Sequence, residues 1–276
     1  PLMSYHTQRP SPQLPGVATL YPTDHGPGEP VIAGVLQRLV DRLVQEGGAV
    51  PPSSETGYVV PFDPEVFKSV ALTLLDEAGV RYLLHSLASG VVDAPAARGV
   101  VFESKSGPIV LTARVVVDCT GDADIAAFMG AHYTIGREDD GATGPMTLMF
   151  RMAGFERDRF LAYVAAHPDQ WYGVHGLWDL IREAKQRGEL ALNREDILLF
   201  GTPHPHEVVV NSTRITGARG IDVHDLTYAE REGRRQMGEI ASFLRRDVPG
   251  FHNAYVCLLY TSPSPRDRTR SRMPSS

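Results

Sequence analysis

The chain has 276 residues, of which 42% are hydrophobic and 22% charged, and its formal net charge is −6 at pH 7. This length suits one large domain or two modest ones with a sizeable core. No window approaches the roughly 18 consecutive apolar residues of a membrane span. The N-terminus lacks a signal-peptide pattern, and the acidic balance argues against a nucleic-acid partner. We therefore expect an acidic, soluble, cytoplasmic protein.

Residues 257–276 differ in composition from the rest of the chain, with four Arg against one Asp. Back-translated, Cys257 to Ser262 fits TGT-CTC-TTA-TAC-ACA-TCT, which resembles the adapter of transposase-based sequencing libraries. A basic native tail is the alternative interpretation. We predict a translated adapter that is extended and poorly packed. Cys119 is then the only native cysteine, so no disulfide framework or cysteine metal site is expected.

The N-terminal part predicts a loop followed by two helices. Residues 1–28 are rich in Pro and Gly and show no periodicity. Apolar residues at helical spacing predict a helix over residues 31–44, ended by the glycine pair that follows it. A second helix is predicted over residues 63–78, with Asp63 as its cap and Pro64 at its first helical position.

A β-rich block follows over residues 80–118, with a hairpin turn expected at residues 105–107. The run Val115–Val117 is continuously apolar and leads into Asp118. Such a run is typical of a strand that is buried on both faces. We predict a strand here and a short helix over residues 122–130.

The remaining chain predicts a mixture of strands and helices. Apolar alternation predicts the strands, and spacing near 3.6 residues predicts the helices. In the last helix, basic residues alternate with glutamates, which favours a solvated face over a nucleic-acid patch. The predicted segments are strands over 147–155 and 206–215 and helices over 156–167, 177–190 and 225–250.

The sequence Thr120-Gly121-Asp122 lies between the predicted buried strand and the short helix. A strand that ends in glycine at a helix N-terminus leaves backbone N–H groups free to bind a ligand. Gly121 removes a Cβ from the point of approach, and Thr120 offers a hydroxyl. Asp122 either accepts hydrogen bonds from a ligand or caps the helix. The alternative is that Asp122 is only a cap and Gly121 only a turn.

The stretch "ARVVVDCTGDADIAAFMGAHYTIGRE" resembles the Ala-Lys-x-Val-Ile-Asp-Ala-Thr-Gly-Asp-Gly-Asp signature of FAD-dependent oxidoreductases of the glutathione-reductase superfamily. More narrowly, it is similar to the branch that contains the heterodisulfide reductase A subunit and fumarate-reductase-type flavoproteins. The segments "FDPEVFKSVALTLLDEAGVRYLLHS", "GPMTLMFRMAGF" and "EVVVNSTRITGARGIDVHDLTYAEREGRRQ" resemble the same family in the same order. The resemblance covers about residues 30–256.

The resemblance implies an α/β fold that is truncated at both ends. Residues 1–130 would form a partial FAD/NAD(P)-binding, Rossmann-like domain without its N-terminal Gly-x-Gly-x-x-Gly fingerprint. Residues 131–256 would form an incomplete α+β substrate domain, and residues 257–276 the adapter. By this resemblance, this fragment alone would bind little flavin.

The resemblance also implies FAD as the cofactor of the complete protein. Thr120, Gly121 and Asp122 would lie at the flavin side, and Ala88 would contact adenine through its backbone. Some relatives carry iron–sulfur clusters, but this chain has no cysteine set to hold one. A cluster is therefore possible only through missing segments.

Other polar residues are candidates for substrate chemistry. Arg214 is suited to bind an anionic substrate through its planar fork, with Asn211 beside it. His204 and His206 either shuttle protons or form a loop rim. Cys119 is either a small core residue or a redox thiol.

We predict flavin-mediated hydride or electron transfer on a small substrate or with a redox partner. A non-catalytic flavin relay subunit of a larger electron-transfer complex and a ligand-free α/β module remain the alternatives.

Overall fold

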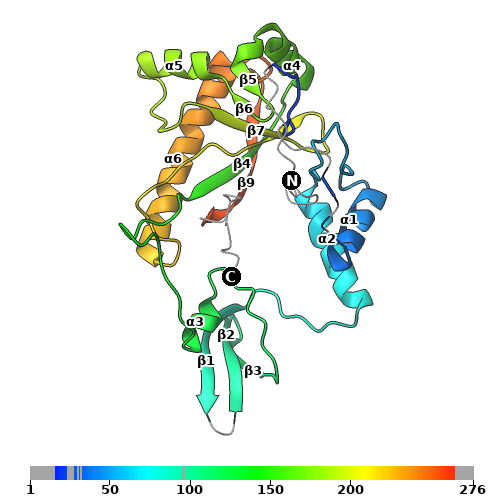
Figure 1. Ribbon diagram of the computed structural model, residues 1–276, viewed down its shortest axis with the longest axis vertical. Helices are drawn as coiled ribbons and strands as arrows, with labels where there is room; N and C mark the ends of the chain where they lie inside the picture. Colours follow the sequence, from blue (N-terminus) through cyan, green and yellow to red (C-terminus); the bar gives the residue numbers. More distant parts are fainter. Residues whose placement is uncertain (1–15, 24–27, 30, 32, 95–96, 265–276) are drawn as a thin grey trace. The chain divides into compact units, whose positions relative to one another are not determined.

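The computed structural model describes residues 16–23, 28–29, 31, 33–94 and 97–264. Its chain divides into two compact units (Figure 1). Unit 1 combines Pro1–Leu74 with Thr143–Ser276, and unit 2 is Leu75–Ala142. The functional boundary that we expect at residue 130 stays a prediction.

Unit 1 is built on a six-stranded antiparallel sheet with the strand order β5-β6-β7-β8-β4-β9. In β4, every second residue is buried, as expected of a strand with one face on a core. The helix α6, Val223–Asp247, packs against β4 and β9. The strands are β4 Thr147–Ala153, β5 Trp171–Tyr172, β6 His175–Gly176, β7 Ile197–Gly201, β8 Glu207–Val210 and β9 Tyr255–Ser264.

The main core of unit 1 lies on this sheet and is rich in aromatic rings. The ring of Phe160 lies 5.8 Å from Phe155, 5.1 Å from Trp171 and 5.9 Å from Phe251, measured between centroids. All four side chains are fully buried. The remaining elements around the sheet are α4 Arg157–Ala166, the 3-10 turn Pro168–Gln170 and α5 Trp178–Gln186.

The two predicted N-terminal helices are both present, and only the start of the first differs from the prediction. The first, α1, spans Val35–Gln45 and starts later than predicted because Gly34 before it has a positive φ of 64°. The second, α2, spans Pro64–Glu77. Asp63 caps α2 as predicted, since its Oδ1 accepts a hydrogen bond of 2.7 Å from the Glu65 N–H. The two helices and the segment between them enclose a small core.

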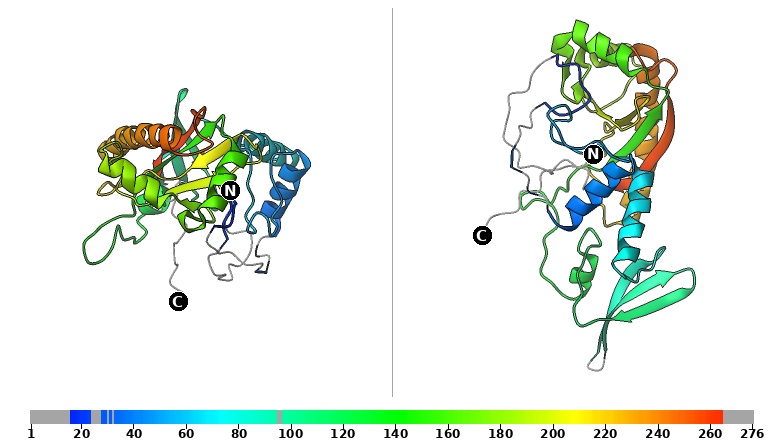
Figure 2. Two further views of the ribbon diagram at one scale, coloured as in Figure 1. Left: turned by 90° about the horizontal axis from the view of Figure 1, so that it is seen from above. Right: turned by 90° about the vertical axis from the view of Figure 1, so that its right-hand side faces the viewer.

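Unit 2 is a three-stranded antiparallel sheet with one short helix. The strands are β1 Leu87–Ala94, β2 Ala97–Ser104 and β3 Gly107–Thr112, in that order. The turn between β2 and β3 confirms the predicted hairpin. The helix α3, Asp124–Phe128, contacts β1 and buries Ile125. Figure 2 shows the sheet and this helix from two further directions.

The prediction of a buried strand over Val115–Asp118 is wrong. The segment forms no strand, and Val115 and Val117 are 78% and 79% exposed. An apolar run becomes a buried strand only where neighbouring strands pair with its backbone and other layers cover its faces. Among the described residues, no strand pairs with this run and no layer covers it.

The prediction that residues 257–276 are extended is confirmed for residues 257–264, whereas the expected poor packing does not hold at Leu259. Residues 257–264 continue β9, which pairs with β4 in antiparallel register. Leu259 lies opposite Phe150 and packs against the main core. Pairing with a buried strand explains this order, because β4 offers a full row of backbone donors and acceptors. Residues 265–276 lie outside the described residues, and the adapter origin stays a prediction.

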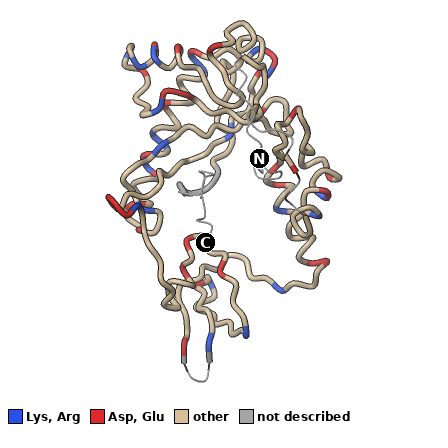
Figure 3. The backbone as a smooth tube through the Cα atoms, viewed as in Figure 1, with Lys and Arg blue, Asp and Glu red and all other residues tan. Residues whose placement is uncertain are grey.

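Acidic and basic residues are interspersed along α6, as the backbone colouring of Figure 3 shows, and several of them form ion pairs. Arg234 pairs with Glu230, and Arg235 with both Glu232 and Glu239, all at spacings of three or four residues. Such pairs are neighbours on a helix surface. None of the described helices combines the length and the apolar character needed to cross a bilayer.

Candidate functional site

The loop from Asp118 to Ala126 in unit 2 is organised by one carboxylate. Asp118 Oδ1 accepts hydrogen bonds from the N–H and the hydroxyl of Thr120, at 2.9 and 2.7 Å. Asp118 Oδ2 accepts a third from the Ala126 N–H at 2.8 Å. These donors, the Thr120 N–H first among them, hold the pKa of Asp118 below its ordinary value. Sequence reasoning missed this role, although an Asx-type turn was a usable signal.

The Thr120 hydroxyl is already used within this loop. It donates to Asp118 and accepts a hydrogen bond of 2.9 Å from the Asp124 N–H, the first N–H of α3. The N-cap position of α3 is Ala123, in left-handed conformation with φ 58°, and its side chain makes no capping bond. Thr120 and Asp118 therefore satisfy the start of α3, and the alternative that Asp122 caps this helix is wrong.

Asp122 is left exposed and free by this arrangement. Its carboxylate has no hydrogen-bond or ion-pair partner among the described residues. Gly121 before it has a φ of 113°, a conformation that only glycine adopts without strain. The turn therefore presents one uncommitted carboxylate beside a bare backbone, which suits a ligand rich in hydroxyl or N–H groups.

Ala88 lies in the same unit, on the edge strand β1, opposite Phe102 of β2. A β-bulge follows it, between Ala88 and Gly90. The outer backbone groups of an edge strand have no ladder partner in the sheet, so β1 can offer its main chain to a ligand. Because α3 contacts β1, the structure brings Ala88 and the Thr120–Asp122 turn into one small unit.

Cys119, in the same loop, is exposed rather than a small core residue. The core interpretation is wrong because the preceding valines are themselves not covered. The redox interpretation stays a prediction.

Asn211 and Arg214 lie in unit 1, directly after β8, on a firmly held segment. The two residues between them, Ser212 and Thr213, are buried. Their hydroxyl groups form hydrogen bonds with the backbone of the neighbouring strands β7 and β4, where backbone–backbone bonds would otherwise continue the sheet. Ser212 Oγ accepts from the Leu198 N–H of β7 at 2.8 Å. Thr213 Oγ1 accepts from the Leu148 N–H of β4 at 2.7 Å and donates to the Leu148 carbonyl at 3.1 Å.

The backbone of Arg214 is fixed from the opposite side by α6. The buried Gln236 accepts from the Arg214 N–H at 2.7 Å and donates to its carbonyl at 3.2 Å. In contrast, the half-buried side chains of Asn211 and Arg214 have no hydrogen-bond or ion-pair partner among the described residues. The sequence singled out Asn211 and Arg214 as candidates, but not the buried hydroxyls and amide that position them.

Replacing Thr213 with Val tests this frame. We expect the free energy of unfolding to fall by about 2 kcal/mol, because the buried Leu148 N–H loses its acceptor. Thr213→Ser keeps the hydroxyl and removes one methyl group, so it should cost about 1 kcal/mol or less. Urea denaturation of the two variants measures the difference. Equal losses would show that the hydroxyl does not hold the segment.

The β7–β8 connection carries His204 and His206, and the His204 ring contacts another part of unit 1. His204 Nε2 lies 2.6 Å from Asp63 Oδ2, so it contacts the residue that caps α2. Partial burial opposes ionisation of Asp63, but the His204 ring and the N–H groups at the start of α2 outweigh it and lower its pKa. The carbonyl of His206 accepts a hydrogen bond from the Phe155 N–H at 3.1 Å. The ring contact of His204 favours the loop-rim interpretation for that residue, and the role of the exposed His206 ring stays a prediction.

A second His–Asp pair was not predicted from the sequence because its members are 21 residues apart in the chain. His175 Nδ1 lies 3.2 Å from Asp196 Oδ2, and Arg194 donates to Asp196 Oδ1 at 3.0 Å. Burial raises the pKa of Asp196, but His175 and Arg194 outweigh it, so the pKa lies below its ordinary value. The His175 ring also contacts Trp178 edge to face.

This pair predicts acid sensitivity. Because the folded-state pKa of Asp196 is lowered, its contribution to stability is present above the unfolded-state pKa of about 3.9. That contribution is lost as the pH falls through the folded-state pKa. Asp196→Asn should cost about 2 kcal/mol at neutral pH, and the gap to the wild type should close at low pH. Urea denaturation across the acid range would contradict this if the gap stayed constant.

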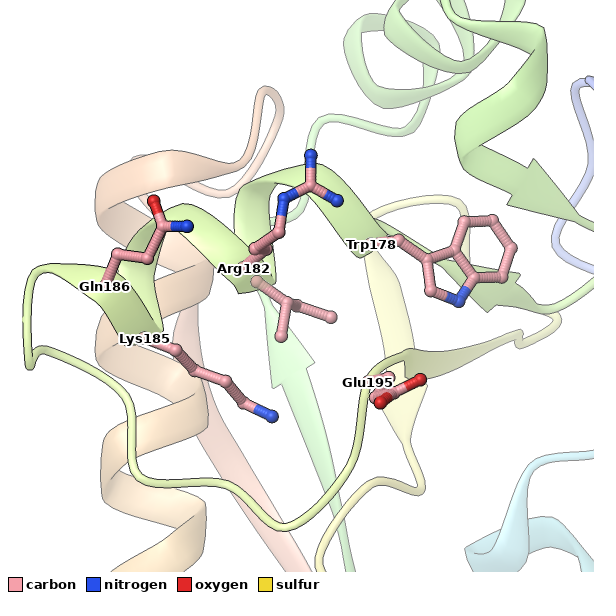
Figure 4. A pocket seen from close by; sticks show the side chains of 6 residues that line it. Trp178, Arg182, Lys185, Gln186 and Glu195 are labelled. Carbon is pink, nitrogen blue, oxygen red and sulfur yellow. The ribbon is translucent and has the colours of Figure 1, made fainter.

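A pocket of about 510 Å³ lies beside α5 (Figure 4). Its lining is Trp178, Ile181, Arg182, Lys185, Gln186 and Glu195. None of the residues predicted as site residues lines it. Among the described residues, no group of His, Cys, Asp and Glu side chains is placed to hold a metal ion.

Comparison with known proteins defines the class. Residues 12–272 match the model of the family described as FAD dependent oxidoreductase. The chain belongs to this family of FAD-dependent oxidoreductases, and its cofactor is FAD. No curated protein matches the chain significantly.

Among solved structures, the chain is similar to p-nitrophenol 4-monooxygenase PnpA from Pseudomonas putida DLL-E4, with 11% identity and a TM-score of 0.43. The match covers 76% of this chain and 44% of the monooxygenase, so the chain spans less than half of that protein's length.

The free groups of unit 2 fit such a cofactor. FAD carries ribose and ribityl hydroxyl groups, which an uncommitted carboxylate such as Asp122 can accept hydrogen bonds from. The open turn at Gly121 suits close approach by a ligand. The Thr120 side chain fits less well than expected, because its hydroxyl hydrogen is directed to Asp118.

Proposed function

We propose that this chain forms part of an FAD-dependent oxidoreductase of the glutathione-reductase superfamily, in the branch related to the heterodisulfide reductase A subunit and fumarate-reductase-type flavoproteins. The single observation that carries the cofactor site is the free carboxylate of Asp122 on a turn preset by Asp118. Bound FAD would supply hydride or electron transfer. We also propose a cytoplasmic location, because the chain is acidic and has few cysteines.

In this proposal, unit 2 holds the cofactor. Asp122 accepts hydrogen bonds from cofactor hydroxyls, Gly121 leaves room at the backbone, and Thr120 shapes the turn through Asp118. Ala88 offers its main chain at the sheet edge to the adenine side. Asp118 is a positioning residue in this arrangement, since its oxygens are occupied by the loop.

Unit 1 handles the substrate in this proposal. Asn211 and Arg214 present free amide and guanidinium groups from a segment fixed on both sides. A guanidinium fork binds carboxylate or phosphate oxygens in two parallel hydrogen bonds. The substrate is therefore a small anionic molecule, which Arg214 orients and Asn211 contacts through its amide.

We further propose that the FAD-binding domain continues outside these 276 residues. Unit 2 buries Val100 and Ile125 but leaves a large apolar surface, including all three valines of the run 115–117. Exposed apolar surface of this extent marks a missing partner. Further strands of the FAD-binding domain would pair with this run, cover it and complete the cofactor site.

The visible flavin absorption band tests this proposal. The 276-residue chain expressed alone should purify with little flavin and aggregate readily, because unit 2 exposes apolar surface. A longer chain that includes the rest of the FAD-binding domain should be yellow. A stoichiometric flavin band from the 276 residues alone would refute the need for further strands. A longer protein that never binds flavin would refute the cofactor site.

A further inference from the structure

The pocket beside α5 combines an apolar wall with two cationic side chains and one carboxylate. Trp178 and the fully buried Ile181 supply the wall. In Figure 4, the Lys185 side chain reaches from α5 toward the loop that carries Glu195, and the Trp178 ring lies on the Glu195 side. Its volume of about 510 Å³ falls within the range of about 300–1,000 Å³ that is usual for small-molecule sites.

Two neighbouring rings, those of Tyr172 and His175, contact the Trp178 ring and hold it in place. The Trp178 ring meets Tyr172 edge to face at 5.3 Å and His175 at 5.8 Å, between ring centroids. Asp196 fixes His175 in turn, at 3.2 Å. A rigid aromatic wall of this kind favours a flat apolar group, because little side-chain entropy is lost on contact.

Lys185 and Glu195 are the two charged side chains of the pocket that can act on a ligand. Lys185 Nζ donates one hydrogen bond of 2.5 Å to the Arg194 carbonyl, which leaves two of its three N–H donors. Glu195 is exposed and has no hydrogen-bond or ion-pair partner among the described residues. Arg182, the other cation, is paired with Asp179 at 2.5 Å.

These features together select the charge of the ligand. A purely cationic ligand would face Lys185 with a like charge, and a purely anionic one would face Glu195. Like-charge contacts of this kind disfavour binding. A zwitterion can direct its cationic group to Glu195 and its anionic group to Lys185 while an apolar group lies on Trp178.

We propose that this pocket is a binding site for a small zwitterion with an aromatic side group, the chemistry of an aromatic α-amino acid. The proposal does not depend on the flavin site, because all residues that carry it lie in unit 1.

Three ligands that differ only in charge test the proposal: L-phenylalanine, phenethylamine without the carboxylate, and 3-phenylpropanoate without the ammonium group. The ¹H–¹⁵N spectrum reads out the site, because the chain has only two Trp indole groups. Trp171 Nε1 is buried and donates to the carbonyls of Thr19 and Gly173, so its signal reports the fold. The Trp178 signal reports the pocket, and Trp178→Phe assigns it.

L-phenylalanine should shift the Trp178 signal and bind on the order of ten-fold more tightly than either analogue. Glu195→Gln should remove the preference over 3-phenylpropanoate. Glu183→Gln, an exposed change on α5 outside the pocket lining, should leave this preference intact. An unchanged Trp171 signal verifies that each variant is folded. Equal binding of the three ligands, no shift with L-phenylalanine, or an unchanged preference in Glu195→Gln would overturn the proposal.

Discussion

Phe160→Ala should lower the free energy of unfolding of unit 1 by about 4 kcal/mol, the usual cost of removing a buried phenylalanine ring. The ring is fully buried and lies within 6 Å of three other aromatic rings, with centroid distances between 5.1 and 5.9 Å. Two of these contacts are edge to face, with interplanar angles of 85° and 90°. Their loss adds to the cavity that the substitution leaves.

The backbone near this cluster leaves little room for collapse into that cavity. Gly250, with φ 90°, lies so close that an added Cβ would meet the Phe160 N–H at 3.1 Å and the Glu156 carbonyl at 2.7 Å. Because the neighbouring backbone cannot move into the cavity, the cavity stays open, and the loss in free energy of unfolding stays large.

The matched control for Phe160→Ala is Tyr228→Ala on α6, where the ring is 55% exposed. A surface substitution of this kind should change stability by no more than about 0.5 kcal/mol. Urea denaturation followed by tryptophan fluorescence suits both variants, because Trp171 belongs to the cluster. A loss below about 1 kcal/mol for Phe160→Ala would contradict the assignment of this cluster as the centre of the core.

Most helices and several strands could be predicted from the sequence because their signals are local. The cap Asp63 and the following Pro64 define the start of α2, and the period-two burial of β4 follows directly from its residues. The short strands β5 and β6 have two residues each and give no periodic pattern. Their pairing with β7 depends on contacts across the chain, which no local pattern reports.

The valine run 115–117 shows why a correct local signal can give a wrong structure. Its composition is that of a buried strand, yet burial is supplied by neighbours and not by the run itself. Residues 257–264 show the reverse effect. Their composition indicated a foreign tail, but the open side of β4 accepts an extended segment with little demand on its side chains.

The candidate site was predicted only in part for a similar reason. The sequence singled out Asp122 and Arg214 by their residue types. It did not reveal Asp118, Thr213 or Gln236, whose hydrogen bonds position them. Positioning residues act through geometry in space, so a single sequence gives little indication of them.

Asp122→Ala should weaken FAD binding by about ten-fold or more in the protein that carries the complete FAD-binding domain. A hydrogen bond to a charged group contributes about 1.5–3 kcal/mol, and about 1.4 kcal/mol corresponds to a factor of ten. Stability should change little, because the Asp122 side chain is exposed and has no partner among the described residues.

Asp124→Ala provides the matched control for Asp122→Ala. Asp124 is an acid two residues further on, in the first turn of α3. Its own N–H is satisfied by Thr120, and no cofactor contact is assigned to its side chain. The variant should retain FAD within about three-fold of the wild type, which corresponds to less than 1 kcal/mol.

The most direct test is therefore the flavin-to-protein ratio, measured from the visible flavin band after dialysis of wild type, Asp122→Ala and Asp124→Ala in parallel. In the longer protein that carries the complete FAD-binding domain, we expect the wild type and Asp124→Ala to keep their flavin, while Asp122→Ala loses it without unfolding. Equal retention by all three proteins, or a larger loss from Asp124→Ala, would contradict the assignment of the Thr120–Asp122 turn as the cofactor site.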